Sequence, residues 1–190
     1  MAPDEGRRGT QEADALKAAF ACFARNGLRH TSMEDIAREL GRSRPVVYRY
    51  FTDKNDAFRA VAGRILAAAL DVARERAAAD GAVADRVYGV VSAKLELAIR
   101  VNAESPHHAR EILAEDSGVI AEQVVSYIAS LQKLIVGVLA EHTGRARARE
   151  IAEILIALTR GLEQDLTHPK ATRARLRLAT DLICRDIPTA

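Results

Sequence analysis

The chain has 190 residues, of which 48% are hydrophobic, 28% are charged and 4% are aromatic, and tryptophan is absent. This length suits one full domain or a small domain fused to a larger one, and a core of small aliphatic side chains favours packed helices over a β-sandwich. The composition excludes long disorder away from the ends. The polar opening lacks the apolar core of a signal peptide, and no apolar run approaches the roughly 20 residues of a membrane span. We therefore expect a cytoplasmic protein with no membrane partner.

The formal net charge of +2 is concentrated in the first third of the chain. Residues 1–60 hold 11 Lys or Arg and 9 Asp or Glu, and the remaining residues hold 17 of each sign. Within residues 41–54, four cations stand against Asp53 alone. These cations are Arg42, Arg44, Arg49 and Lys54. A positive cluster beside a neutral body is typical of a nucleic-acid contact.

The start of the chain is predicted to form a short arm followed by a helix. We expect a flexible arm over residues 1–11, in which Arg7 and Arg8 are free to touch a phosphate backbone. The first helix starts near residue 12. Asn26 and Gly27 end it, because Gly27 tolerates a positive φ.

A second helix starts at Thr31 and Ser32 and ends at Gly41. Two capping arrangements are compatible with the sequence there, Thr31 with Glu34 or Ser32 with Asp35. Apolar residues at helical spacing then make one face of this helix. They are Met33, Ile36, Ala37 and Leu40.

A third, short helix is capped by Ser43 and tolerates Pro45 in its first turn. Asp53, with Asp56 three residues later, opens a long helix that runs to Asp80-Gly81. Further helical stretches follow at about 83–103, 105–116, 119–143, 146–167 and 171–187. No period-2 strand occurs, so the expected fold is all-α. We divide it into the arm (1–11), a helix-turn-helix domain (12–53) and a helical effector-binding and dimerisation domain (54–190).

The short helix over residues 44–51 has two different sides. Val47 and Phe51 fall together on a helical wheel and are placed to pack on the second helix. The opposite side presents Pro45, Val46 and Arg49, with Tyr48 and Tyr50 at its flanks and Arg44 near the start. Arg49 can contact guanine O6 and N7, and the apolar groups can touch a thymine methyl. The tyrosine hydroxyls can donate to phosphates, although half-buried packing tyrosines are the alternative.

The runs Ile36-Ala-Arg-Glu-Leu-Gly41 and Ser43-Arg-Pro-Val-Val-Tyr48-Arg-Tyr-Phe51, followed by Lys54, resemble the TetR family of bacterial repressors over about residues 12–66. The resemblance implies base contacts from Arg44, Pro45, Val46 and Arg49. It implies phosphate contacts from Ser32 or Thr31, Tyr48, Tyr50 and Lys54, and Ser43 completes this candidate surface. Arg42 departs from the family, which usually has a buried Val there. Either its head lies in solvent, with a phosphate within reach, or the turn is repacked.

The last two helices are the candidates for dimerisation. Each carries an apolar stripe that in a monomer would simply be core. The resemblance implies dimerisation through these helices, and a helix-turn-helix reads palindromes as a symmetric pair. The stripes consist of Ile151, Ile154, Leu155, Leu158 and Leu162, and of Leu176, Ala179, Leu182 and Ile183.

Candidates for other sites are fewer. Gln123 and Tyr127 put polar tips on an otherwise apolar helix side, where an effector could bond them, although protein partners or solvent would serve equally. His107 with Glu111 lacks a third ligand, so no metal is expected, and no cofactor is implied. Cys22 and Cys184 are expected to be buried, inert thiols.

These observations predict a ligand-responsive repressor that binds a palindromic DNA operator as a homodimer and is released by a small molecule. An enzyme using His107, Glu111 and Glu115 is a weaker alternative, because no catalytic motif supports it and no catalytic residue stands out. A helical interaction protein that keeps the DNA-binding module without an effector is the third hypothesis.

Overall fold

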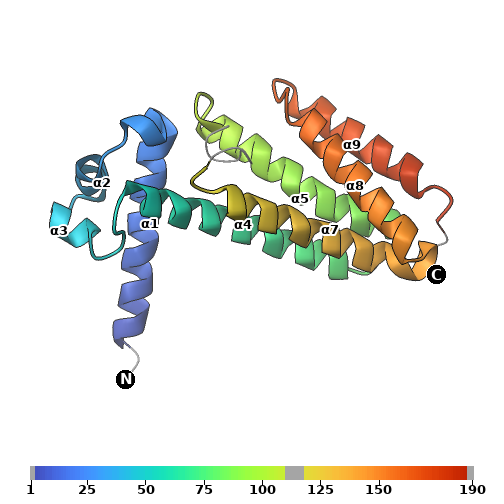
Figure 1. The fold of residues 1–190 in the computed structure, drawn as a ribbon, viewed down its shortest axis with the longest axis horizontal. Coiled ribbons are helices and arrows are strands. Elements are labelled where there is room, and N and C mark those ends of the chain that lie inside the picture. Colours follow the sequence, from blue (N-terminus) through green and yellow to red (C-terminus); the bar gives the residue numbers. More distant parts are fainter. Residues whose placement is uncertain (1–2, 110–117, 188–190) are drawn as a thin grey trace. The chain divides into compact units, whose positions relative to one another are not determined.

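The computed structural model describes residues 3–109 and 118–187 of the chain, with side chains from residue 9 onward. These residues form eight α-helices and no strand, which confirms the all-α prediction (Figure 1). The helices are α1 (Pro3–His30), α2 (Met33–Leu40), α3 (Arg44–Val47), α4 (Lys54–Ala78), α5 (Val83–Glu104), α7 (Ala121–Thr143), α8 (Arg145–Leu162) and α9 (Pro169–Cys184). Most of the predicted helix 105–116 lies outside the described residues.

Helix α1 differs from its prediction at one end and agrees with it at the other. It begins at Pro3, so residues 3–11 are helical rather than an arm. Pro followed by Asp4 and Glu5 is a favourable helix start, because acidic residues suit the positive end of the helix dipole. At the other end Gly27 has φ 70° and ψ 169°, which breaks the helix before a last turn to His30. The side chains of Arg7 and Arg8 lie outside the described part.

The start of α2 settles the choice between the two predicted caps. Ser32 is the N-cap residue, and its hydroxyl oxygen accepts a 3.2 Å hydrogen bond from the Asp35 amide. The Asp35 carboxylate in turn accepts from the Ser32 amide at 3.0 Å and from the Ser32 hydroxyl at 2.6 Å. This capping box satisfies amides that have no partner in the helix. At the other end Gly41 adopts φ 65°, as a left-handed C-cap.

The third predicted helix is shorter than expected. Helix α3 covers only Arg44–Val47, and the chain continues to Tyr50 in tight turns with hydrogen bonds from Arg49 to Val46 and from Tyr50 to Val47. The Phe51 amide still bonds the Val47 carbonyl at 3.1 Å, so these two residues keep their helical spacing. Ser43 occupies the N-cap position without a side-chain bond, and Pro45 lies in the first turn.

The chain divides into two compact units, and the first is larger than the predicted domain 12–53. It comprises Met1–Ile65 and Val101–Gln123. Phe58 of α4 explains the extension, because its ring meets that of Phe23 edge-on at a centroid distance of 5.1 Å and both rings are buried. The Ser105 hydroxyl also donates to the Ala24 carbonyl at 3.2 Å. The beginning of α4 therefore belongs to the core of the helix-turn-helix unit.

The second unit comprises Leu66–Arg100 and Val124–Ala190. Its core is aliphatic, as predicted from the composition, with fully buried Leu95, Leu131, Ile135, Leu155 and Leu176 among its largest members. One buried ion pair lies among them. Lys94 Nζ is 2.7 Å from both carboxylate oxygens of Glu163, and the Lys94 side chain is 8% exposed. A buried charge requires such compensation.

Two helix boundaries in this unit depart from their predictions. Helix α8 ends at Leu162 rather than near 167, and α9 starts at Pro169 rather than 171. The connection is held by Asp165, whose carboxylate accepts from the Thr167 amide at 3.0 Å and hydroxyl at 2.6 Å. Such a local turn competes with helix continuation, and Pro169 then occupies a first-turn position of α9.

Helix α7 meets the length and apolarity of a membrane span by composition, unlike the expectation from the sequence, and it alone does so among the described residues. Its buried side chains recur at helical spacing, and 39% of its most apolar stretch is buried within the fold. Val124, Ile128, Leu131, Ile135 and Leu139 are among the buried ones. A core helix passes the same test, and the buried side of α7 is consistent with one.

Candidate nucleic-acid interface

The recognition segment (residues 44–51) is held by its buried side. Val47 is fully buried and Phe51 is 3% exposed, as the helical wheel predicted. Helix α2 contributes Ile36 and Ala37, which are buried as well, and α2 packs on α3. This apolar contact fixes the orientation of the segment, so the side opposite Val47 must face outward.

The outward side carries the residues predicted to read bases. Arg44, Pro45 and Arg49 are exposed, and Val46 is half-buried. The Arg49 guanidinium makes no hydrogen bond or ion pair with the described residues, so it is available to an external acceptor. A guanidinium presents paired N–H donors in a plane, which suits the two acceptors on a guanine edge.

Tyr48 lies beside Arg44 on this surface. The Tyr48 hydroxyl oxygen accepts a 2.9 Å hydrogen bond from Arg44 Nη2, and the guanidinium carbon lies 5.4 Å from the centre of the Tyr48 ring. The ring is 41% exposed. Because the phenol oxygen accepts this bond, its own hydrogen remains free to donate to a phosphate. The contact orders both side chains before DNA arrives.

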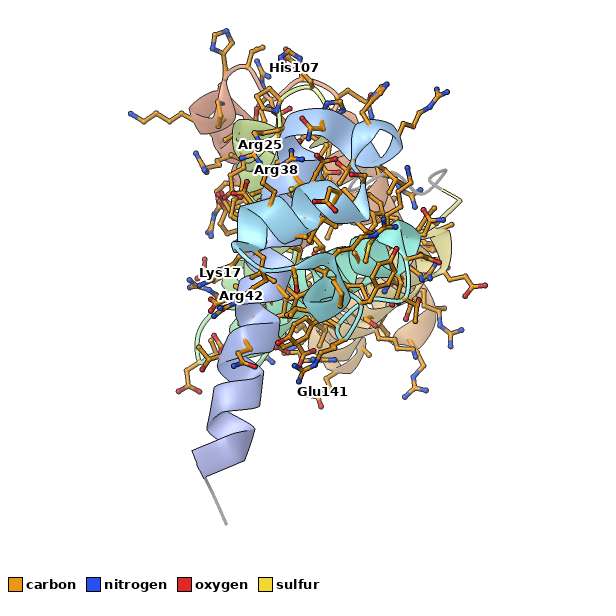
Figure 2. The ribbon with its side chains drawn as sticks, turned by 90° about the vertical axis from the view of Figure 1, so that its left-hand side faces the viewer. Lys17, Arg25, Arg38, Arg42, His107 and Glu141 are labelled. Atoms are coloured by element: carbon orange, nitrogen blue, oxygen red, sulfur yellow. The ribbon has the colours of Figure 1, made fainter. Side chains whose placement is uncertain are left out.

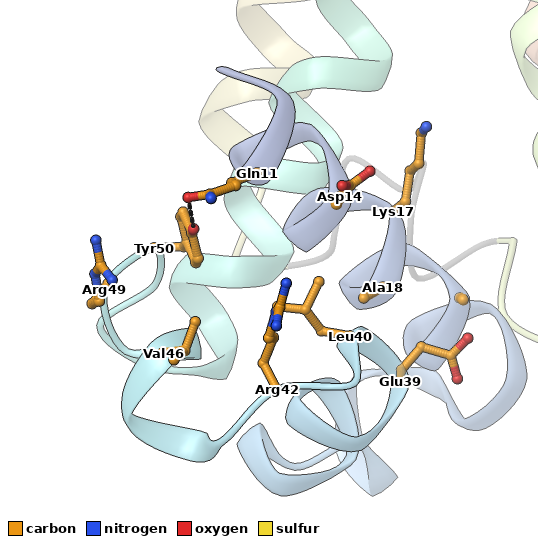
Figure 3. A pocket seen from close by; sticks show the side chains of 11 residues that line it. Gln11, Asp14, Lys17, Ala18, Glu39, Leu40, Arg42, Val46, Arg49 and Tyr50 are labelled. Carbon is orange, nitrogen blue, oxygen red and sulfur yellow. Dashed lines mark hydrogen bonds between the residues drawn. The ribbon is translucent and has the colours of Figure 1, made fainter. Parts of the chain in front are cut away.

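Tyr50, predicted as a second phosphate contact, is engaged within the protein. Its hydroxyl donates to Gln11 Oε1 of α1 at 3.3 Å, and the side chain is half-buried (Figure 3). The hydroxyl has one hydrogen to donate, so a phosphate would have to displace Gln11. The sequence offered no signal for this partner, because Gln11 falls in the stretch predicted as an arm.

Arg42 is exposed, which decides between the two arrangements left open by its departure from the expected Val. Its head lies in solvent, and the turn keeps its left-handed Gly41. In Figure 3 the Arg42 side chain extends between Val46 and Leu40 toward α1. The neighbouring Ser43 is exposed too, with its hydroxyl unused by the cap.

Thr31 is incorrectly included among the predicted DNA contacts. It is 2% exposed, and its hydroxyl donates to the Gly27 carbonyl at 2.7 Å. Burial against the kink of α1 leaves no path to a phosphate. Ser32 is exposed, but its hydroxyl hydrogen is already donated to the Asp35 carboxylate, whose negative charge would repel a phosphate.

Lys54 was predicted to anchor a phosphate, and the structure gives its ammonium a different set of partners. Its Nζ donates to the main-chain carbonyl oxygens of Leu28 and Arg29, each at 3.1 Å. These carbonyls belong to the last turn of α1, where helix acceptors lack intrahelical partners. Lys54 thus joins the start of α4 to the end of α1.

The two predicted effector residues lie in different compact units. Tyr127 is 5% exposed, and its hydroxyl has no hydrogen-bond partner among the described residues. Burial, with a smaller contribution from Glu163, raises the pKa of the Tyr127 phenol, so it stays protonated. Gln123 donates from Nε2 to the Arg59 carbonyl at 3.1 Å, and its Oε1 is buried without a partner among the described residues.

The predicted dimerisation stripes mix buried and exposed residues. Ile151, Leu155 and Leu176 are incorrect members, because they are buried inside the protomer and unavailable to a second copy. Exposed members are Ile154 at 56% and Leu182 at 50%. The half-buried members are Leu158, Leu162, Ala179 and Ile183. Leu178, 61% exposed on α9, was not among the predicted members because it lies one position away from the stripe.

The cysteines and histidines form no site among the described residues. Cys22 and Cys184 are buried free thiols, and desolvation raises the pKa of each. A raised thiol pKa disfavours the reactive thiolate, in agreement with the prediction of inert thiols. No cluster of three metal-ligating side chains occurs in the described part. Glu111 and Glu115, the predicted neighbours of His107, lie outside it.

Residues 15–61 match the family model of bacterial regulatory proteins of the tetR family, which confirms the resemblance seen in the sequence. No curated protein matches the chain in a sequence search.

Solved structures share the fold over nearly the whole chain. A transcriptional regulator from Rhodococcus sp. Rha1 superimposes with a TM-score of 0.74 at 20% identity, covering 94% of this chain and 98% of that one. The transcriptional regulator FadR from Bacillus subtilis, in complex with stearoyl-CoA, gives a TM-score of 0.73 at 14% identity, covering 93% and 99%. The SmeT–triclosan complex gives a TM-score of 0.68 at 20% identity, covering 93% and 90%.

Proposed function

The chain belongs to the TetR family of bacterial regulatory proteins through its residues 15–61, and from this premise we propose that it is a ligand-responsive transcriptional repressor. As a homodimer in the cytoplasm it binds a palindromic operator, and a small molecule releases it. The observation that carries the proposal is the exposed side of the recognition segment, where Arg49 projects opposite the buried Val47.

In this proposal Arg49, Val46, Pro45 and Arg44 face base edges in the major groove. Arg49 supplies the base-specific hydrogen bonds, since its guanidinium donors are unused among the described residues. Tyr48 keeps a free hydroxyl hydrogen for a phosphate, which positions the segment without reading sequence. Arg42 and Ser43 extend the phosphate surface.

Selection of double-stranded DNA from a random pool, with the full-length protein, tests this proposal. We expect an enriched palindrome. On the selected operator, Arg49→Ala should weaken binding by about 1–3 kcal/mol and relax preference at one base position in each half-site. Arg147→Ala, at an exposed position of α8, is the matched control and should leave binding unchanged. Failure to enrich any sequence, or an unchanged affinity for Arg49→Ala, contradicts the proposal.

The homodimer is proposed to form through the exposed apolar residues of α8 and α9. Ile154, Leu178 and Leu182 are each at least half exposed, and α8 packs on α9. Large aliphatic side chains exposed on neighbouring helices favour burial against an identical surface. A symmetric pair also places two recognition segments on one palindrome.

An effector is proposed to enter the helical body and bond Tyr127. The phenol is a buried donor without a partner among the described residues. A ligand that supplies an acceptor for this donor is therefore bound more tightly. Gln123 Oε1, which belongs to the other compact unit, is a separate candidate for an effector contact. The complexes of FadR with stearoyl-CoA and of SmeT with triclosan support a compound with a large apolar part.

Thermal-shift measurements with stearoyl-CoA, triclosan and a panel of apolar carboxylates and phenols test the effector. A compound that raises Tm and also releases the selected operator supports the repressor proposal. Binding without release, across all stabilising compounds, contradicts ligand control and favours a DNA-binding protein that uses no effector.

A further inference from the structure

A groove of about 720 Å³ lies between α1 and the recognition segment (Figure 3). Val46 and Arg49 of the recognition segment line one side. Asp14 and Lys17 of α1 line the other, with Arg42 between them. All these residues belong to the first compact unit. The groove therefore shares its rim with the residues proposed to read bases.

The hydrogen bond between Tyr50 and Gln11 ties the two sides of the groove together. Because one partner lies in α1 and the other in the recognition segment, the bond restrains the width of the groove. Ala18, a buried residue of α1, and half-buried Leu40 contribute apolar surface to it. The groove is thus lined by both apolar and charged side chains of one compact unit.

The charges in the groove are predominantly positive once the pairing within the protein is considered. Lys17, Arg42 and Arg49 are exposed and pair with no carboxylate among the described residues. Lys17 and Arg42, both labelled in Figure 2, line the same groove. Of the two carboxylates, Glu39 pairs with Arg25, and Asp14 pairs with no cation among the described residues.

We propose that this groove seats the sugar–phosphate backbone that borders the major groove entered by the recognition segment, with Lys17 and Arg42 on its phosphates. The inference rests on the proposed function. The major groove is about 12 Å wide and is bordered by phosphate backbones, so a cationic groove directly beside base-reading residues faces such a backbone. Asp14 lies against the same phosphates and limits the affinity by repulsion.

Operator affinity measured as a function of salt tests the assignment, because each phosphate contact contributes about 0.9 to the slope of log K against log salt. Lys17→Gln and Arg42→Gln, each present twice in a dimer, should each reduce the slope by about 1.8. Both should weaken binding evenly across base sequences. Asp14→Asn, also present twice in a dimer, should strengthen binding about two- to thirty-fold without changing base preference, the size of two exposed charge interactions.

Arg147→Gln on α8 is the matched control, an exposed arginine outside the groove, and should leave the slope unchanged. Unchanged slopes for both Lys17→Gln and Arg42→Gln, with Arg49→Ala still weakening the operator complex, overturn this inference and leave the proposed function standing. An Asp14→Asn variant that binds the operator no more tightly than the wild-type protein also overturns this inference without affecting the proposed function. Absence of any selected operator overturns the proposed function itself.

Discussion

Lys54 donates a hydrogen bond from Nζ to the main-chain carbonyl oxygen of Leu28 at 3.1 Å. The two residues are 26 positions apart, and the bond joins the first residue of α4 to the last turn of α1. A second bond, to the adjacent Arg29 carbonyl, uses another of the three ammonium hydrogens. Lys54, predicted from the sequence to contact a DNA phosphate, thus also joins two of the helices that hold the recognition segment.

Lys54→Met should lower the free energy of unfolding by about 1–2 kcal/mol, since it removes a charged donor and its hydrogen bonds to two main-chain carbonyls. Urea denaturation measures this. Lys133→Met, at an exposed position of α7, is the control and should change stability little. If Lys54→Met weakens operator binding while stability is unchanged, the lysine is a phosphate anchor only.

The capping box of α2 should make stability depend on acid pH. Hydrogen bonds from the Ser32 hydroxyl and amide lower the pKa of Asp35 below its ordinary 3.8. The folded state therefore favours the ionised carboxylate, and the stabilisation is present above about pH 4 and is lost as the pH falls through the lowered pKa. The urea midpoint of the wild-type protein should fall more steeply between pH 5 and pH 2 than that of Asp35→Asn. Glu75→Gln, exposed on α4, should follow the wild-type curve, and parallel curves for Asp35→Asn would contradict the prediction.

Tyr127→Phe should change the thermal shift produced by an effector without lowering the stability of the ligand-free protein. Because the buried hydroxyl has no partner among the described residues, its removal should leave the free energy of unfolding unchanged or raise it by about 1 kcal/mol. The same change should weaken the thermal shift produced by an effector that bonds the phenol. A clear loss of stability in the ligand-free protein would show that the hydroxyl has a protein partner.

Leu178→Glu and Leu182→Glu should each convert a dimer into monomers in sedimentation equilibrium, since both side chains are exposed on the protomer at 61% and 50%. Operator affinity should fall at least about ten-fold, because the two half-sites are then bound independently. Val125→Glu is the matched control, an apolar residue of α7 that is 59% exposed. Dimers that survive both leucine changes would place the interface elsewhere.

Much of the helical layout could be predicted, because the signals are local. Gly41 has the positive φ expected of a helix C-cap, and Gly27 breaks α1 where the sequence indicated an end. The wheel of residues 44–51 placed Val47 and Phe51 on the buried side. Boundaries were less predictable. Helix α8 ends earlier than predicted, and hydrogen bonds from Thr167 to the Asp165 carboxylate form a local turn in place of further helix.

Individual site residues were harder to predict, because their availability depends on neighbours distant in sequence. Thr31 and Ser32 are adjacent and equally polar, yet Thr31 is buried on carbonyls of α1 and Ser32 is exposed in the cap. Likewise Ile151 and Ile154 share one apolar stripe, but only Ile154 remains at the surface. Periodicity identifies an apolar face and does not say how much of it the protomer itself covers.

By itself the sequence determined the all-α class, the helix-turn-helix and which side of the recognition segment is exposed, because caps, glycines and apolar periodicity act within one segment. The tertiary structure decided which polar side chains of the candidate interface remain available to an external partner. Lys54 bonds the end of α1, Tyr50 bonds Gln11, and Lys17 comes to share a groove with Arg42. Each of these contacts joins residues at least 25 positions apart, so it exists only once burial of the apolar faces has brought the helices together.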